Sequence, residues 1–234
     1  QIATNLDLSP TNLDALVGAA KENKVDLVVV GPEAPLAAGI VDKLQGFGIP
    51  AFGPTREAAL IESSKVFAKK LMHKYGIPCA KDAIFSSFKE AEAYVKKQSI
   101  PVVIKADGLA AGKGAIVAQS MDEALKALSD IIENRVFGDA GNQVLVEECL
   151  VGRETSLLAF TDGKTVVPMV TARDYKRAFD KDMGPNTGGM GCYSPSRFLE
   201  KKAIDGAMKT IVEPVVKAMT KEGKPYKGGL YTGL

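Results

Sequence analysis

Residues 102–118 read VVIKADGLAAGKGAIVA, and this stretch decides the fold expected for the rest of the chain. The runs 102–104 and 116–118 are apolar and rich in β-branched residues, which is typical of strands. Between them, residues 108–114 are mostly glycine and alanine and include one lysine, Lys113. We therefore predict a β-hairpin whose tip presents bare backbone N–H groups beside a lysine, an arrangement that suits a polyphosphate.

The spacing within this loop excludes a Walker-type phosphate loop. That motif has four residues between its first glycine and its Gly-Lys pair, and then Ser or Thr before a helix. Here three residues separate Gly108 from Gly112, Lys113 is followed by Gly114, and a strand comes next. For the loop taken alone, a flexible hairpin tip with a solvated lysine is the alternative.

The composition is that of an ordinary globular protein. The 234 residues are 46% hydrophobic and 25% charged, with a formal net charge of +2, which suffices for one large or two small domains. The near-neutral charge gives no indication of a nucleic-acid partner, and no apolar run approaches the roughly 18 residues of a membrane-spanning helix. We therefore expect neither nucleic acid nor a membrane among its partners.

The cysteines and the histidine limit the expected metal and redox chemistry. Cys79, Cys149 and Cys192 are widely spaced and form no Cys-x-x-Cys pair, which favours reduced thiols in a cytoplasmic protein. The single histidine, His73, leaves no room for a multi-histidine metal site, and we expect it to have a surface or packing role on a helix. Because the chain starts at Gln1 and ends in the strand-like run GGLYTGL, we expect an internal segment of a longer chain.

The opening region alternates helix and strand. Ser9 and Pro10 predict the start of a helix, and the apolar runs 26–30 and 49–52 predict strands with a second helix between them. This alternation indicates part of a doubly wound parallel sheet, in which ligands bind beyond the carboxyl ends of the strands. Residues 31–36 would then border a pocket, unless they form only a turn.

The region that precedes the glycine-rich hairpin is expected to be largely helical. One amphipathic helix is predicted over 57–75 and ends at Gly76, with its lysines, Lys69 among them, on a solvated face. Ser87 with Glu90 has the spacing of a capping box, which predicts a second helix.

The region after the hairpin predicts further antiparallel structure. Ser120 with Glu123 is another capping box and starts a helix over 121–134. Asp162-Gly163 joins two apolar runs, which is the strongest short signal for a β-hairpin. This part of the chain therefore looks like antiparallel α+β modules that differ from the opening region.

Residues 173–195, RDYKRAFDKDMGPNTGGMGCYSP, are long for a connection without secondary structure. Cationic and acidic side chains are mixed in it, and the run NTGG follows at 186–189. This mixture predicts a mobile loop that closes over an anionic ligand, and a flexible solvated loop is the alternative. A last helix is expected over 199–221.

Taken together, these motifs resemble the ATP-grasp superfamily and, within it, the phosphoribosylamine–glycine ligase family. GPEAPL and PNTGGMG are more specific to this ligase family than to ATP-grasp enzymes in general. The matching stretches run in order through nearly the whole chain: VVVGPEAPLAAGIVD at 28–42, FGPT at 52–55, ESSKVFAKKLM at 62–72, VVIKADGLAAGKGAIVA at 102–118, VEECLVGRETS at 146–156 and GPNTGGMGCYSP at 184–195.

The resemblance implies a mixed α/β fold with two domains. Residues 1–60 would be the remainder of a partial doubly wound parallel N-terminal domain, and residues 61–76 a connecting helix. A two-lobed ATP-grasp domain would follow, with a small subdomain over 77–150 and a large subdomain over 151–234 that is truncated at its C-terminal end.

The resemblance also implies an ATP site. Lys105 would reach the phosphates from its strand and Lys65 from the preceding helix, under the 108–114 hairpin. Residues 147–150 would be the hinge that holds adenine, and Glu154 the acid that binds ribose. The implied ATP contacts are Lys65, Lys105, Gly108, Lys113, Gly114, Glu147, Glu148, Leu150 and Glu154.

The implied reaction joins glycine to 5-phosphoribosylamine through an acyl phosphate, with ATP and Mg²⁺ (or Mn²⁺) as cofactors in purine biosynthesis. Lys105 and Arg177 are the implied catalytic residues. No metal ligand is expected in this chain, because the family's magnesium-binding stretch would follow Leu234, and the segment alone is expected to be inactive. The implied substrate contacts are Gly31, Pro32, Glu33, Asp174, Lys176, Arg177, Asn186, Thr187 and Gly188.

Two residues differ from the pattern of the family, and two other functions are alternatives. Tyr175 stands where the family commonly has histidine, and Arg173 where a neutral polar residue is usual. The alternatives to the glycine ligase are a non-catalytic nucleotide-binding module and another ATP-grasp carboxylate–amine ligase. Fusion of the parent chain to other purine-pathway domains is left open.

Overall fold

The glycine-rich hairpin lies at the edge of a four-stranded antiparallel sheet in the computed structural model, which describes residues 2–110, 114–180 and 183–234. The sheet has the strand order β3-β6-β4-β5, so β6 and β4 are its central strands. The predicted hairpin is confirmed, since β4 and β5 pair antiparallel. The strands are β3 (Asp82–Phe85), β4 (Val102–Ala106), β5 (Ala115–Ala118) and β6 (Val144–Glu148).

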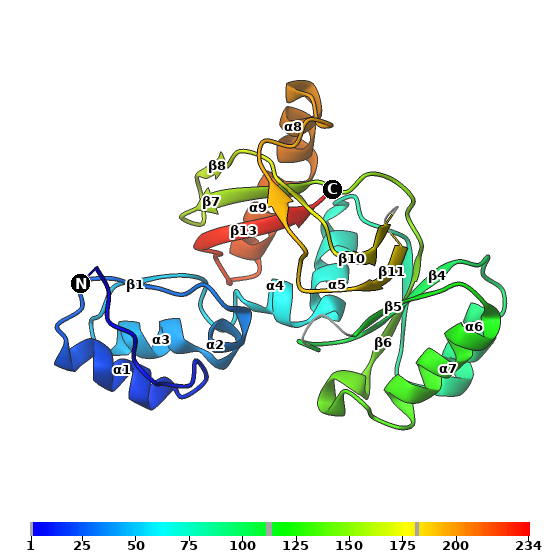
Figure 1. Ribbon diagram of the computed structural model, residues 1–234, viewed down its shortest axis with the longest axis horizontal. Helices are drawn as coiled ribbons and strands as arrows, with labels where there is room; N and C mark the ends of the chain where they lie inside the picture. Colours follow the sequence, from blue (N-terminus) through cyan, green and yellow to red (C-terminus); the bar gives the residue numbers. More distant parts are fainter. Residues whose placement is uncertain (1, 111–113, 181–182) are drawn as a thin grey trace.

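Alternation along the central strands gives this sheet two different faces. Val102, Ile104 and Ala106 are buried in an apolar cluster with two helices, α6 (Phe88–Val95) and α7 (Met121–Ile132). Successive residues of a strand point to opposite faces, so Lys105 lies on the face away from these helices. Figure 1 shows α6 and α7 side by side on the outer side of the sheet.

The capping predictions around these helices had different outcomes. Ser120 caps α7 as predicted, because its Oγ accepts a hydrogen bond from Glu123 N at 3.2 Å. Ser87 precedes α6 but its side chain makes no capping hydrogen bond, so the predicted capping box with Glu90 was wrong. A short 3₁₀ helix, Gly138–Asn142, leads into β6.

The helix predicted over 57–75 is two helices, α4 (Leu60–Ser63) and α5 (Lys65–Tyr75). Ser64 has an extended conformation between them, and its Oγ accepts a hydrogen bond from Phe67 N at 3.0 Å. This cap restarts the helix and changes its direction. As predicted, α5 ends at Gly76, which is left-handed with φ +65°.

The opening region contains the expected parallel strand pair, β1 with β2. Its first helix begins later than predicted, since Asn12 rather than Ser9 accepts the capping hydrogen bond, from Ala15 N. The predicted second helix is broken at Gly39, which has φ +94°. The elements are α1 (Leu13–Glu22), β1 (Val28–Val29), α2 (Glu33–Ala38), α3 (Ile40–Gly46) and β2 (Ala51–Phe52).

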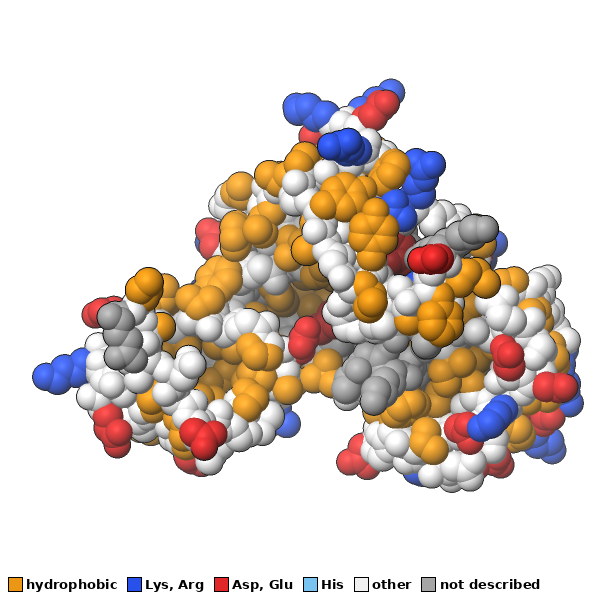
Figure 2. All heavy atoms as spheres, in the orientation of Figure 1, with side chains coloured by type: hydrophobic (Ala, Val, Ile, Leu, Met, Phe, Trp, Pro, Cys, Tyr) orange, Lys and Arg blue, Asp and Glu red, His pale blue; other side chains and the backbone are white. Residues whose placement is uncertain are grey.

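A second antiparallel sheet has three strands in the order β13-β7-β8. Leu157 and Ala159 of this sheet pack against the last helix. Phe160 and Val167 are exposed, and Figure 2 shows hydrophobic side chains on the surface in this region. The predicted helix over 199–221 is continuous but contains a π-helical turn, Met208–Val212. The elements are β7 (Ser156–Thr161), β8 (Val166–Pro168), β13 (Gly228–Gly233), α8 (Lys201–Ala207) and α9 (Glu213–Lys221).

The long segment 173–195, predicted to be a loop, contains four short strands, while its closure over an anionic ligand stays a prediction. Two antiparallel ribbons form, one from β10 with β11 and one from β9 with β12. Next to these ribbons, the backbone N–H of Thr187 donates a hydrogen bond to the carbonyl of Lys176 at 2.7 Å. The residue pattern did not indicate this pairing. The strands are β9 (Arg173–Asp174), β10 (Arg177–Phe179), β11 (Met183–Asn186) and β12 (Cys192–Tyr193).

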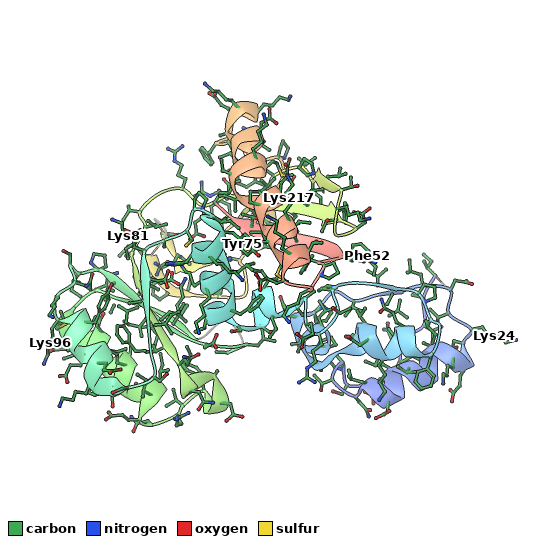
Figure 3. All side chains as sticks on the ribbon, turned by 180° about the vertical axis from the view of Figure 1, so that it is seen from behind. Lys24, Phe52, Tyr75, Lys81, Lys96 and Lys217 are labelled. Atoms are coloured by element: carbon green, nitrogen blue, oxygen red, sulfur yellow. The ribbon has the colours of Figure 1, made fainter. Side chains whose placement is uncertain are left out.

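Two aromatic contacts join the parts of the molecule. Tyr75 lies where α5 meets α9, and its hydroxyl donates to Glu222 Oε1 at 2.7 Å (Figure 3). Phe52 of the opening region packs edge-on against Phe160 of β7, with ring centroids 5.9 Å apart. Across the described residues, no helix is both long enough and apolar enough to span a membrane.

Candidate functional site

A chain of buried ion pairs lies on the face of the four-stranded sheet that α6 and α7 leave free. Lys105 Nζ donates to Glu147 Oε2 at 2.7 Å, and the other oxygen of Glu147 lies 3.6 Å from Lys69 Nζ. Lys69 also lies 3.4 Å from Asp82 Oδ1. The side chains of Glu147 and Asp82 are 5% and 2% exposed, so both carboxylates depend on these lysines for charge compensation.

Lys69 therefore contradicts the prediction of a solvated face. Its side chain is only 10% exposed, and its Nζ donates to the carbonyl of Ala80 at 2.7 Å in addition to the two carboxylates. The neighbouring Lys70 is exposed, as predicted. The helical period cannot distinguish a lysine that covers a carboxylate from one that faces solvent, because both lie on a polar stripe.

The start of α5 is tied to the end of β4. Lys65, the first residue of α5, donates from its Nζ to the carbonyl of Gly108 at 2.7 Å. Asp107 accepts hydrogen bonds from Ser64 Oγ and from Val66 N at 3.0 Å. These bonds hold Lys65 at the base of the hairpin, which Lys105 adjoins on β4.

Charges of both signs surround Lys65. Burial lowers the pKa of Lys65, Asp107 and Glu62 raise it, and the like charge of Lys105 lowers it. A bound polyphosphate would offset the repulsion between the two ammonium groups and replace part of their lost hydration.

Two glycines of the hairpin occupy positions that have no room for a side chain. Gly108 has φ +128°, and a Cβ there would lie 3.0 Å from the Cβ of Ala140. A Cβ on Gly114 would lie 2.5 Å from the Cβ of Ala110. The predicted contact Lys113 falls outside the described residues.

The predicted adenine hinge follows β6. Glu148 Oε1 accepts a hydrogen bond from Lys81 N at 2.8 Å, so this carboxylate fixes the start of β3. Leu150 is 70% exposed, and Glu154 is also exposed in the connection to β7. These three residues are therefore available at the surface beside Glu147, but they are not held together by contacts of their own.

The predicted substrate residues of segment 173–195 are organised by hydrogen bonds within that segment. Arg177 donates from a guanidinium nitrogen to the carbonyl of Gly184 at 2.7 Å, and Thr187 Oγ1 donates to the carbonyl of Lys176 at 2.9 Å. The Lys176 ammonium lies 3.9 Å from Asp174 Oδ2. Asn186 is paired through its backbone with Arg177, and Gly188 is exposed in the turn that follows.

Glu62 is influenced by charged residues from three parts of the chain. Partial burial and the negative charge of Glu33 raise the pKa of Glu62, whereas Lys65 and Lys176 lower it. Glu33 is the first residue of α2, after Gly31 and Pro32 at the end of β1. Charged groups of the opening region, of α5 and of segment 173–195 therefore all act on the pKa of Glu62.

Three residues of this site were not singled out from the sequence. Glu62 and Lys69 lie inside the matching stretch ESSKVFAKKLM, and Asp107 inside the 102–118 stretch. The spacing Ser64-x-x-Phe67 was a usable signal for a cap, but the partner of Ser64 is 43 residues away. Such long-range partners cannot be derived from local periodicity.

Comparison with known proteins places this site in a family. The model of the phosphoribosylglycinamide synthetase N domain matches residues 1–62, and that of the phosphoribosylglycinamide synthetase ATP-grasp (A) domain matches residues 63–234. The chain belongs to the phosphoribosylglycinamide synthetase family. The resemblance indicated by the motifs is thus confirmed, and so is the mixed α/β ATP-grasp fold.

Relatives of the phosphoribosylglycinamide synthetase family match along nearly the whole chain. A phosphoribosylamine–glycine ligase of Halalkalibacterium halodurans is 50% identical over 233 residues, which are 100% of this chain and 54% of that protein. The crystal structure of phosphoribosylamine–glycine ligase from Thermotoga maritima has a TM-score of 0.79 at 34% identity, over 92% of this chain and 53% of that one. The chain thus spans about half the length of the curated relatives it matches.

A more distant neighbour shares only the fold. The biotin carboxylase domain of Hydrogenobacter thermophilus 2-oxoglutarate carboxylase, solved with MgADP, ADP and bicarbonate, has a TM-score of 0.72 at 19% identity. The match covers 95% of this chain and 48% of that one. This likeness shows a shared fold alone.

One cluster of potential metal ligands occurs among the described residues, and its chemistry is not that of magnesium. Within 2–110, 114–180 and 183–234, one group of at least three His, Cys, Asp or Glu side chains is close enough to share an ion, namely His73, Cys79 and Asp82. Mg²⁺ takes oxygen ligands in octahedral geometry, which a thiol and an imidazole do not provide. The nucleotide's metal is accordingly not assigned to ligands in this part of the chain.

Proposed function

We propose that this chain supplies the ATP-binding and substrate-contacting part of a ligase that joins glycine to 5-phosphoribosylamine, giving glycinamide ribonucleotide, ADP and phosphate in purine biosynthesis. The observation that carries the proposal is the convergence of Lys65 and Lys105 at the base of the glycine-rich hairpin. Lys65 bonds to Gly108, the first residue of the loop, and Lys105 lies on the strand that enters it. Family membership supports this choice of reaction.

The proposed chemistry has two steps. The carboxylate of glycine attacks the γ-phosphorus of ATP, a bond forms to the phosphoryl group, and ADP leaves. The amine of phosphoribosylamine then attacks the acyl carbon of the resulting acyl phosphate, loses a proton, and expels phosphate to leave an amide. Charge spreads over the phosphoryl oxygens in the first step, so preorganised cations lower its barrier.

Lys105 and Lys65 are the cations that we assign to the phosphates. Lys105 is held by Glu147 and Lys65 by the carbonyl of Gly108, so both side chains are oriented before the nucleotide arrives. On binding, phosphate oxygens would replace or share these acceptors. Gly108 and Gly114 would let the hairpin backbone approach the phosphates closely, and Lys113 would act from its tip. The implied adenine and ribose contacts are Glu147, Glu148, Leu150 and Glu154.

The substrates would bind where Glu33, Glu62 and Lys176 come together. Carboxylates there suit the amine of phosphoribosylamine, and Lys176 with Arg177 suits the phosphate of that substrate or the carboxylate of glycine. Because an acyl phosphate hydrolyses easily, the ribbons of segment 173–195 would need to exclude water during the reaction. The implied contacts on this side are Gly31, Pro32, Glu33, Asp174, Lys176, Arg177, Asn186, Thr187 and Gly188.

Magnesium or manganese would accompany ATP in the complete enzyme and neutralise phosphate charge there. The catalytic contribution that we assign to this chain is made by its lysines and by Arg177.

The proposal is tested by measuring the phosphate released from ATP. The protein used contains these 234 residues and has the full length of the relatives. We expect release of phosphate from ATP that requires both glycine and phosphoribosylamine and that Lys105→Ala abolishes. A non-catalytic nucleotide-binding module would bind ATP without glycine-dependent release. Another carboxylate–amine ligase would release phosphate with a different carboxylate, and either result would overturn the proposal.

A further inference from the structure

The loop that follows α5 returns the chain onto the end of the helix. Gly76 adopts the left-handed conformation and lets the chain reverse, and β3 then starts at Asp82. As a result, His73 in the last turn of α5 faces Cys79 and Asp82. All three residues lie within ten consecutive positions of the chain. The ligand-type atoms of these three side chains all lie within 4.8 Å of one another.

His73 and Asp82 line a surface depression of about 330 Å³, together with Lys69, Lys70, Ala83 and Ile84. The thiol of Cys79 lies within 4.8 Å of their ligand atoms. The Asp82 side chain is 2% exposed, whereas the His73 side chain is 54% exposed, so the carboxylate lies deep and the imidazole lies at the rim. A small ion can enter from solvent and still reach the buried oxygen.

The ligand types point to a borderline-soft divalent cation. We propose that His73, Cys79 and Asp82 form a binding site for Zn²⁺ or a similar transition-metal ion, with solvent in the fourth position. Imidazole nitrogen, thiolate sulfur and carboxylate oxygen are the three ligand types that zinc takes in proteins, usually in tetrahedral geometry. With Cys79 as thiolate and Asp82 ionised, the ligand set carries two negative charges against the two positive charges of the ion.

Binding of an ion requires the three ligand atoms, which lie within 4.8 Å of one another, to close around it, with the sulfur about 3.5 Å from the other two. His73 Nε2 lies 2.7 Å from Asp82 Oδ1, which is a hydrogen-bond distance. Two ligands of a tetrahedral ion with bonds of about 2.0 Å lie about 3.3 Å apart, so the imidazole must move out by a fraction of an ångström. Since His73 is exposed at the end of its helix, it can make this movement without disturbing the core.

The surroundings contain charges of both signs. Lys69 and Lys70 oppose a cation, but Glu147, 3.6 Å from Lys69, remains as a counter-charge for that lysine when Asp82 binds the ion. The carbonyl groups at the end of α5 carry the negative end of the helix dipole, which favours a cation beside its last turn.

This site is separate from the proposed nucleotide site. Lys69 and Glu147 stand between Asp82 and Lys105, and the ligand chemistry differs from that of magnesium. Binding at the His73–Cys79–Asp82 site can therefore be measured without nucleotide, and its failure would leave the proposed ligase reaction unaffected.

Cobalt binding to the metal-free chain tests the proposal, because Co²⁺ bound to a thiolate gives a charge-transfer absorption band. We expect one Co²⁺ per chain with this band, its loss in Cys79→Ser, and an affinity that falls by more than about tenfold in His73→Ala. Cys192→Ser is the matched control, because this cysteine is exposed and lies in β12. It should bind as the unsubstituted chain does.

Competition identifies the class of ion. Zn²⁺ should displace Co²⁺ and remove the band, whereas an excess of Mg²⁺ should not. Absence of the band from the unsubstituted chain, its survival in Cys79→Ser, or an unchanged affinity in His73→Ala would each overturn the site. Displacement by Mg²⁺ but not by Zn²⁺ would overturn the assignment to a borderline-soft ion.

Discussion

Lys105 and Glu147 form a diagonal pair across the two central strands of the four-stranded sheet. Val103 lies directly opposite Glu147 in the β4–β6 register, and Lys105 follows two residues later on the same face. The 2.7 Å contact between Lys105 Nζ and Glu147 Oε2 is thus a consequence of strand pairing. It places the expected phosphate-binding lysine beside the expected adenine hinge before any ligand is present.

The buried lysine Lys69 should contribute strongly to stability. Lys69→Met leaves Asp82 and Glu147 short of compensating charge, and breaking a buried ion pair from one side costs about 3–5 kcal/mol. Denaturant unfolding of the variant measures the loss. Lys70→Met is the control, since it changes the exposed neighbour and should alter stability by less than about 0.5 kcal/mol. Equal effects of the two substitutions would contradict the buried network.

The backbone at Gly114 should be intolerant of a side chain. Because the new Cβ would lie 2.5 Å from the Cβ of Ala110, Gly114→Ala must displace the hairpin, and we expect weaker ATP binding by calorimetry. Gly206→Ala is a matched substitution in α8, where no atom lies within 4 Å of the new Cβ. It should add about 0.5–1 kcal/mol of stability and leave ATP binding unchanged. If both variants bind ATP equally well, the hairpin does not form the phosphate site.

Tyr226 should make the chain less stable in alkali. Burial raises the pKa of Tyr226 to about 12 from its usual 10.0, with a contribution from Glu62. Between these two values the unfolded chain loses the phenol proton and the folded chain keeps it, so the free energy of unfolding falls as pH rises. A shift of about two pKa units corresponds to at most about 2.7 kcal/mol.

The alkaline loss is measured by unfolding at several pH values. Tyr226→Phe should lack this part of the loss, although it also removes the hydrogen bond from the hydroxyl to the carbonyl of Gly229. Tyr231→Phe, which changes a half-exposed tyrosine, should keep the loss. Identical pH profiles for the unsubstituted chain and Tyr226→Phe would show that the phenol is not buried.

Local patterns predicted the elements whose signals are confined to a few residues. The β4–β5 hairpin, the Ser120 cap and the end of α5 at Gly76 each depend on neighbouring residues, and each was predicted correctly. Ser64 caps α5 locally through Phe67 N, but its hydroxyl also bonds to Asp107, just after β4, and local periodicity does not indicate that contact. Helical period alone favoured one continuous helix there.

The candidate site was predictable only through family motifs. The positions of Lys65 and Lys105 follow from the resemblance, whereas their convergence requires the α5–β4 contacts made by Asp107. The buried state of Lys69 and the position of Glu62 depend on residues far along the chain. Segment 173–195 was misjudged because its ribbons are stabilised mainly by backbone pairing, which leaves little pattern in the side chains.

The assignment of the phosphate site to Lys105 is tested most directly by calorimetric titration of ATP into this chain and into Lys105→Ala. Lys89→Ala, which changes an exposed lysine of α6, is the control. We predict binding by the unsubstituted chain and by Lys89→Ala. In Lys105→Ala the loss of a charge-assisted contact of about 1.5–3 kcal/mol should weaken binding by about ten- to a hundredfold. Equal affinity of Lys105→Ala and the unsubstituted chain would contradict the assignment of the phosphate site to Lys105 and the glycine-rich hairpin.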